Sequence, residues 1–118
     1  METNYLYEDL NNYGGVYNLI FPFFQKPVHK LLEKMPYSKI DEIWLFGSII
    51  TNLTGIDSDI DICIVGDIDI EDTKGLWSVD KIPVDLIWCK KNEFYKMVKD
   101  VNSVFSDVFN QGVKIYGR

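Results

Sequence analysis

An alternation of aspartates running into an apolar segment constrains this chain more than any other feature. Asp57, Asp59 and Asp61 occupy every second position, and the apolar run ICIV follows directly. Residues two apart share one face of a β-strand. The pattern predicts a strand over residues 59–65 that carries two carboxylates on one face. The opposite face then carries the core residues Ile60, Ile62 and Ile64.

Apolar periodicity and turn residues predict the other elements. Pro27 suits a first helical turn, and Pro36 ends that helix. The expected helices are 27–35, 49–53, 93–100 and 103–111, and the other expected strands are 43–46, 83–89 and 113–116. This order predicts an α/β (α+β) fold, a small mixed β-sheet backed by helices on one side. The chain reads as a single domain over 1–118, with an aromatic-rich N-terminal extension (1–26) and a core (27–118).

Composition excludes several classes of function. The chain has 118 residues, enough for one domain, and a net charge of −6. It therefore lacks the basic face of a duplex-binding protein, and nucleic acid is not expected as the main partner. No apolar run approaches the ~20 residues of a membrane span, and no secretory signal is visible, so a cytoplasmic protein is expected.

Cysteine and histidine usage narrows the chemistry further. Cys63 and Cys89 offer neither zinc spacing nor a disulfide framework, and we expect buried thiols. His29 is the single histidine, which argues against Ser-His-Asp chemistry and histidine-rich metal sites.

The aspartates point to a cation. Asp59 and Asp61 on one face raise each other's pKa, and a divalent cation between them removes the repulsion. Mg²⁺ is commonly held by one or two carboxylates plus substrate phosphates. Asp85, in the next predicted strand, can stand beside them if the strands are neighbours. An EF-hand is excluded, because its required Gly and Glu positions hold Ile62 and Ile68. A solvated acidic edge strand is the alternative that this pattern leaves open.

Gly47 and Ser48 lie where a predicted strand turns into a helix. Backbone N–H groups at such a helix start attract phosphate, glycine permits close approach, and serine adds a hydroxyl. The sequence thus predicts a phosphate-binding turn on one side and a metal-binding pair on the other, as phosphoryl chemistry requires.

Gly-Ser, ten residues, then Asp-x-Asp resembles the signature of the DNA polymerase β-like nucleotidyltransferases. The chain looks like a minimal nucleotidyltransferase from about Pro27 to Tyr116, and its ending NQGVKIYG also resembles that branch. The resemblance implies that Asp59, Asp61 and Asp85 bind two Mg²⁺ ions and that Asp85 helps to activate an acceptor hydroxyl. It also implies that Gly47 and Ser48 bind the nucleotide phosphates, and that NMP is transferred with release of pyrophosphate.

The resemblance also implies a partner. Such proteins often accompany an HEPN-domain toxin as its antitoxin and adenylylate a tyrosine of it, with ATP as substrate. The alternatives are a subunit that modifies a small molecule, as aminoglycoside nucleotidyltransferases do, and an inactive binding module. The sequence leaves open whether the protein forms a homo-oligomer.

The sequence departs from the family pattern after the Gly-Ser pair. Thr51 stands where many relatives have arginine, and the lysines that could compensate are Lys74, Lys81 and Lys90. Of the tryptophans, Trp44 and Trp88 are expected in the core, and Trp77 is the better candidate for a surface contact.

Overall fold

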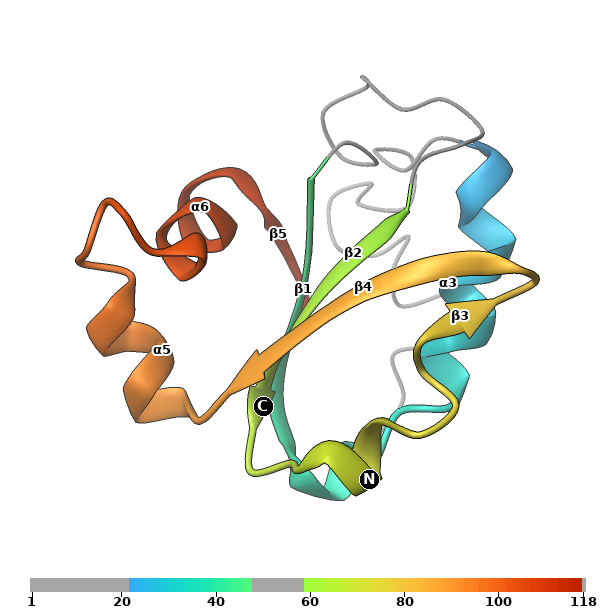
Figure 1. The fold of residues 1–118 in the computed structure, drawn as a ribbon, viewed down its shortest axis with the longest axis horizontal. Coiled ribbons are helices and arrows are strands. Elements are labelled where there is room, and N and C mark those ends of the chain that lie inside the picture. Colours follow the sequence, from blue (N-terminus) through green and yellow to red (C-terminus); the bar gives the residue numbers. More distant parts are fainter. Residues whose placement is uncertain (1–21, 48–58, 118) are drawn as a thin grey trace.

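A computed structural model describes residues 22–47 and 59–117, which form one mixed sheet with helices packed against it (Figure 1). The sheet order is β3-β4-β2-β1-β5. The strands are β1 (Ile40–Phe46), β2 (Ile60–Gly66), β3 (Ser78–Val79), β4 (Ile82–Cys89) and β5 (Val113–Gly117). The helices are α3 (Pro22–Glu33), α5 (Lys91–Met97) and α6 (Val104–Gln111), with 3-10 turns η1 (Tyr37–Lys39) and η2 (Ile70–Thr73).

The pairing makes the sheet mixed, as predicted. β1 runs antiparallel to both β2 and β5, and β3 runs antiparallel to β4. β2 and β4 are parallel neighbours. The predicted α+β class with a small mixed sheet is therefore confirmed.

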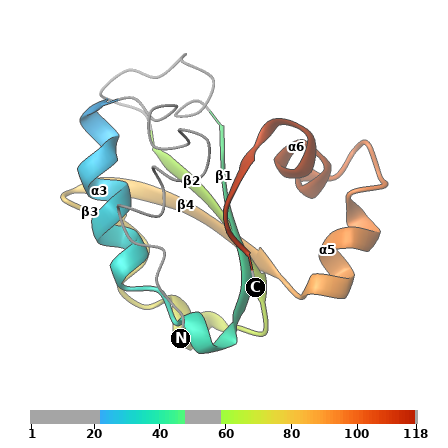
Figure 2. The same cartoon turned by 180° about the vertical axis from the view of Figure 1, so that it is seen from behind.

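The helices cover both faces of the sheet, which corrects the expectation of one-sided backing (Figures 1 and 2). Helix α3 contributes Leu31 and Leu32 to one cluster, together with the β2 residues Ile60, Ile62 and Ile64. Helices α5 and α6 contribute Phe94 and Val108 to a second cluster, together with Cys63 and Val65 on the other face of β2. The reason is visible in the run ICIV: a continuous apolar strand needs cover on both faces.

Helix α3 begins earlier than the periodicity predicted. It starts at Pro22, so that Pro27 lies inside the helix and the expected start at residue 27 is wrong. A proline in the first two turns removes only one intrahelical hydrogen bond, which the buried residues Phe24 and Val28 compensate by packing into the core. The expected boundary between an extension and a core at residues 26 and 27 thus falls within one helix.

The stretch between β2 and β4, for which the sequence predicts neither helix nor strand, holds η2 and the short strand β3. Asp69 and Asp72 form a capping box at η2, with N–H···O distances of 3.0 and 3.1 Å. Asp80 and Lys81 turn β3 into β4 with φ of 51° and 68°. Such turns usually contain glycine, asparagine or aspartate, and a lysine after Asp80 in place of glycine leaves no hairpin pattern to predict from.

Other expectations concern single residues. Cys63 and Cys89 are free and buried, and Trp44 is buried, as predicted. No helix of the described segments is long and apolar enough to cross a bilayer. The helix predicted over 49–53 lies outside the described residues, as do Ser48 and Thr51.

Candidate functional site

The parallel pairing of β2 and β4 brings two of the predicted carboxylates together. Asp61 lies directly opposite Asp85 in the register of the two strands. Both side chains project from the face that α5 and α6 cover further along, since Cys63 and Cys89 on the same alternation belong to that cluster. At this end of the two strands Asp85 is exposed and Asp61 is half-buried.

The environment of Asp61 opposes its ionised form. Burial, the charge of Asp85, a hydrogen bond with Asp85 and the charge of Asp59 together raise the pKa of Asp61 to about 6. A carboxyl group with this pKa is mostly ionised at neutral pH. Its ionised form is nevertheless made less favourable by burial and by the charges of Asp85 and Asp59. A cation at this position would remove that opposition.

Gly47 closes the site from the side of β1. Its φ is +78°, a conformation that other residues rarely adopt. A Cβ at this position would lie 2.0 Å from Oδ2 and 2.8 Å from Cγ of Asp61. Glycine is therefore required here because the Asp61 carboxylate occupies the space of the missing side chain, a use of glycine that the sequence did not indicate.

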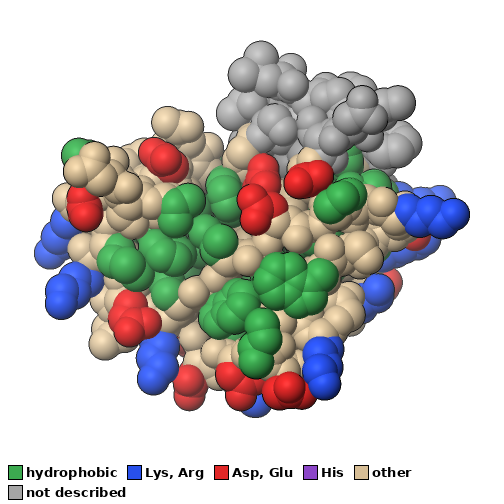
Figure 3. Space-filling view, viewed as in Figure 1, with side chains coloured by type: hydrophobic (Ala, Val, Ile, Leu, Met, Phe, Trp, Pro, Cys, Tyr) green, Lys and Arg blue, Asp and Glu red, His purple; other side chains and the backbone are tan. Residues whose placement is uncertain are grey.

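Asp59 lies one residue before β2 and is exposed. Figure 3 shows acidic side chains together on the surface over the neighbouring ends of β1 and β2. Within the described residues, no group of three or more His, Cys, Asp or Glu side chains is arranged to hold a metal ion. The Asp61–Asp85 pair, with Asp59 beside it, still provides the oxygen ligands that Mg²⁺ uses when phosphates complete its shell. The donor set thus fits a cation bound together with a nucleotide.

The lysines suggested as substitutes for the missing arginine occupy other places. Lys74 forms an ion pair with Glu71, with Nζ 2.9 Å from Oε1. Lys81 lies in the β3–β4 turn, and Lys90 immediately precedes α5 at the far end of β4. None of the three is placed at the Asp61–Asp85 pair by the strand register.

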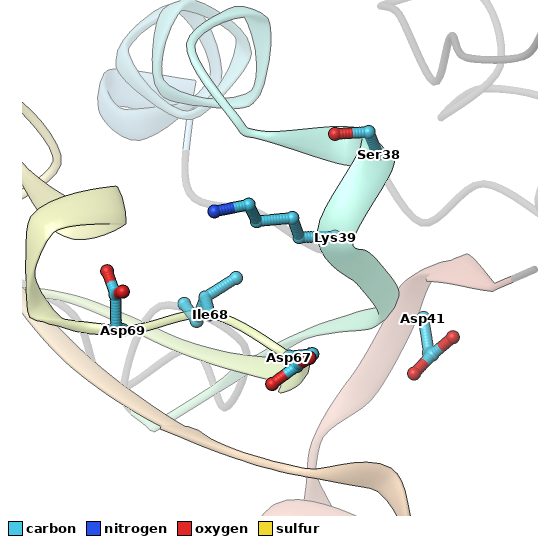
Figure 4. Close-up of a pocket in the computed structure, with 6 residues that line it drawn as sticks. All are labelled: Ser38, Lys39, Asp41, Asp67, Ile68 and Asp69. Atoms are coloured by element: carbon cyan, nitrogen blue, oxygen red, sulfur yellow. The ribbon is translucent and has the colours of Figure 1, made fainter.

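A polar pocket of about 440 Å³ lies at the opposite end of β2 (Figure 4). It is lined by Ser38, Lys39, Asp41, Asp67, Ile68 and Asp69. Figure 4 shows Lys39 extending toward the segment of Ile68 and Asp69, and its Nζ lies 3.0 Å from Oδ1 of Asp72. This pocket contains none of the predicted site residues.

Glu42 is a buried carboxylate that the sequence analysis missed. It is 4% exposed and accepts hydrogen bonds from Trp44 Nε1 at 2.8 Å and from the Tyr95 hydroxyl at 2.8 Å. Glu42 lies outside the strand expected over 43–46, whereas β1 begins at Ile40 and includes both Asp41 and Glu42. The hydrogen bond from Tyr95 connects α5 to β1 through Glu42.

The chain is similar to proteins of known family and of known structure. The family model described as "Nucleotidyltransferase domain" matches residues 28–109. A solved structure described as a toxin–antitoxin with AMP-PNP is 25% identical at a TM-score of 0.52, over 79% of this chain and 73% of that chain. A mutant of the toxin–antitoxin MntA-HpeT is 22% identical at a TM-score of 0.48, again over 79% and 73%. No curated protein matches the chain.

Proposed function

The chain belongs to the nucleotidyltransferase domain family, and we propose that it transfers AMP from ATP to a hydroxyl group of a partner protein. The predicted enzyme class, a nucleotidyltransferase, is confirmed by the match over 28–109. We propose, beyond this class, the nucleotide, the acceptor and the residues that act on them.

The observation that carries the proposal is the contact of three elements at one point. The turn after β1 rests on Asp61 through Gly47, and Asp61 stands opposite Asp85. Backbone N–H groups at such a turn can bind phosphate. Paired carboxylates can bind a divalent cation whose remaining ligands are phosphate oxygens. A nucleoside triphosphate at this point would satisfy both.

Asp59, Asp61 and Asp85 would hold Mg²⁺, which when bound stabilises negative charge on the phosphate oxygens. Gly47 and Ser48 would hold the β- and γ-phosphates through the turn that follows β1. Asp85, the exposed member of the pair, would orient the acceptor hydroxyl and accept its proton. Its exposure lets that proton pass on to solvent.

ATP as the nucleotide is supported by the similarity to the toxin–antitoxin structure with AMP-PNP, which also supports a toxin as partner. The resemblance of the Gly-Ser and Asp-x-Asp pattern to minimal nucleotidyltransferases narrows the partner to an HEPN-type protein and the acceptor to one of its tyrosines. The chain would then act as the antitoxin.

The test is transfer of a label in a lysate of the native host. The purified chain, Mg²⁺ and ATP labelled on the α-phosphate should label one protein, and mass spectrometry should find AMP on a tyrosine. Asp61→Asn should abolish the label, whereas Asp67→Asn, at the exposed far end of the same strand, should retain it. A labelled small molecule without labelled protein would refute a protein acceptor.

A further inference from the structure

The outer edge of β4 is paired over only part of its length. β3 pairs with β4 at two positions, Val79 with Ile82 and Ser78 with Pro83. One more hydrogen bond follows, from Val84 N–H to the carbonyl of Trp77 at 3.0 Å. Beyond Val84 no described strand continues along this edge.

The direction of that last bond fixes which backbone groups face outward. Successive residues of a strand direct their N–H and C=O groups to opposite sides. The backbone N–H of Val84 points away from β2, so the N–H and C=O groups of Leu86 and Trp88 do so too. The N–H and C=O groups of Asp85 and Ile87 point toward β2. Among residues 22–47 and 59–117, no backbone partner lies on the outward groups of Leu86 and Trp88.

In the part of the chain that the structure describes, residues 86–88 of this edge also lack the usual protection. Natural proteins guard free edges with lysine, proline, bulges or a covering element. Here Leu86, Ile87 and Trp88 are all apolar, and β4 has no bulge against β2. Trp77, 45% exposed, stands edge-on to Trp88 with ring centroids 6.0 Å apart. Figure 3 shows apolar side chains on the surface over the middle of β4.

We propose that an extended segment of the acceptor protein pairs with this edge of β4 and thereby delivers its hydroxyl side chain to Asp85. The proposal rests on the proposed nucleotidyl transfer and names its substrate class, a polypeptide bound as an added strand. A row of backbone donors and acceptors is matched by another backbone and by neither a helix nor a small molecule. The net charge of −6 favours a segment with basic residues.

The register explains why the edge serves the chemistry. A residue of the added strand directly opposite Asp85 lies with its Cα about 4.5–5.5 Å from that of Asp85, and its side chain projects on the same face. That face also carries Asp61. A tyrosine at this place therefore reaches the carboxylate pair. Trp77 already lies opposite Val84, so the added strand pairs from the tyrosine onward, and its residues opposite Leu86 and Trp88 lie on the other face, beside Trp88.

The transfer itself balances without a further reactant. The acceptor oxygen forms a bond to the α-phosphorus of ATP, and the bond from that phosphorus to the bridging oxygen breaks. Pyrophosphate leaves with that electron pair, and the hydroxyl proton passes to Asp85 and on to solvent. The product is the AMP ester of the tyrosine.

The test uses a short peptide of valines and lysines with one central tyrosine, Mg²⁺ and ATP labelled on the α-phosphate. A series of otherwise identical peptides carries a single N-methyl group at successive positions. We expect labelled peptide. On the side of the tyrosine that pairs with Leu86 and Trp88, alternate N-methyl groups should reduce transfer at least tenfold, and those between should leave it unchanged. The same alternation is expected whether the peptide pairs parallel or antiparallel to β4. Two peptides methylated at adjacent positions serve as controls for each other.

Amide hydrogen exchange gives a second readout. Adding the unmethylated peptide should slow exchange at Leu86 and Trp88 N–H, and leave Ile87 N–H unchanged because it already bonds to β2. Equal labelling of all N-methyl peptides, or no protection at Leu86 and Trp88, would overturn the edge-pairing proposal while transfer stands. If a lysate protein becomes labelled but none of the peptides does, the edge-pairing proposal is overturned in the same way. If neither peptide nor lysate is labelled, it is the proposed function that fails.

Discussion

Replacing Asp61 with asparagine should stabilise the protein in the absence of metal while removing its proposed activity. In the folded chain the pKa of Asp61 rises from 3.8 to about 6, first through burial and then through Asp85. The ionised carboxylate is therefore less favourable in the folded than in the unfolded state. Asparagine keeps the shape and carries no charge.

The magnitude follows from the shift. About 2 pKa units correspond to roughly 3 kcal/mol, at about 1.36 kcal/mol per unit. Asp61 is half-buried, and solvent screening reduces this to about 1–1.5 kcal/mol. For a domain of this size that is an increase in Tm of roughly 4–8 °C.

The sign determines the pH dependence. Because the folded pKa is the higher one, the unfavourable contribution of Asp61 is absent only well below pH 4, where both states are protonated. It grows as pH rises and is complete above about pH 6. The advantage of Asp61→Asn should therefore be full at pH 7.5 and only a small fraction of that value near pH 4.

The assay is thermal and urea unfolding of both proteins in EDTA at pH 7.5 and pH 4. Asp67→Asn, exposed at the other end of β2, is the matched control and should change stability by less than about 0.5 kcal/mol. Added Mg²⁺ with ATP should raise the Tm of the unsubstituted protein more than that of Asp61→Asn. If Asp61→Asn is neutral or destabilising at pH 7.5, or its gain does not depend on pH, the reasoning on this carboxylate pair is wrong.

Three further predictions concern residues around the site and core. Gly47→Ala should lower stability by about 1–3 kcal/mol in urea, because its Cβ meets a carboxylate and its φ is positive; an unchanged midpoint would contradict the close contact. Tyr95→Phe should cost about 1–3 kcal/mol, since it removes a donor from the buried Glu42, and a neutral result would mean that Glu42 finds another partner. Burial raises the pKa of the Cys89 thiol to about 11 and that of Cys63 further, so neither should react with a disulfide reagent at pH 8 until urea unfolds the chain. Rapid reaction of the native protein would show that these thiols are accessible.

The strand positions of the carboxylates could be predicted because alternation is a local property. The placement of Asp61 and Cys63 on one face of β2 and of Ile62 on the other needs only the period of a strand. The meeting of Asp61 with Asp85 required the two strands to be neighbours, which the sequence analysis stated as a condition and the register fulfils.

What the sequence did not reveal depends on contacts between distant segments. Gly47 reads as a turn residue, and only the folded chain shows that Asp61 fills the space of its missing side chain. The hairpin at Asp80 and Lys81 has a lysine where such turns usually have glycine; the Lys30–Asp80 ion pair, at 3.0 Å, joins it to α3. The two-sided cover of the sheet comes from α3 packing on one face and α5 and α6 on the other. The apolar run ICIV indicates that both faces are covered, but no local pattern specifies which helices cover them.

The central claim is that the Asp61–Asp85 pair transfers the nucleoside monophosphate of ATP. The most direct measurement compares ATP labelled on the α-phosphate with ATP labelled on the γ-phosphate, using the purified chain, Mg²⁺ and host lysate. We predict a labelled protein with the α-label alone, lost in Asp85→Asn and retained in Asp67→Asn. Transfer of the γ-label, or full α-labelling by Asp85→Asn, would contradict the account.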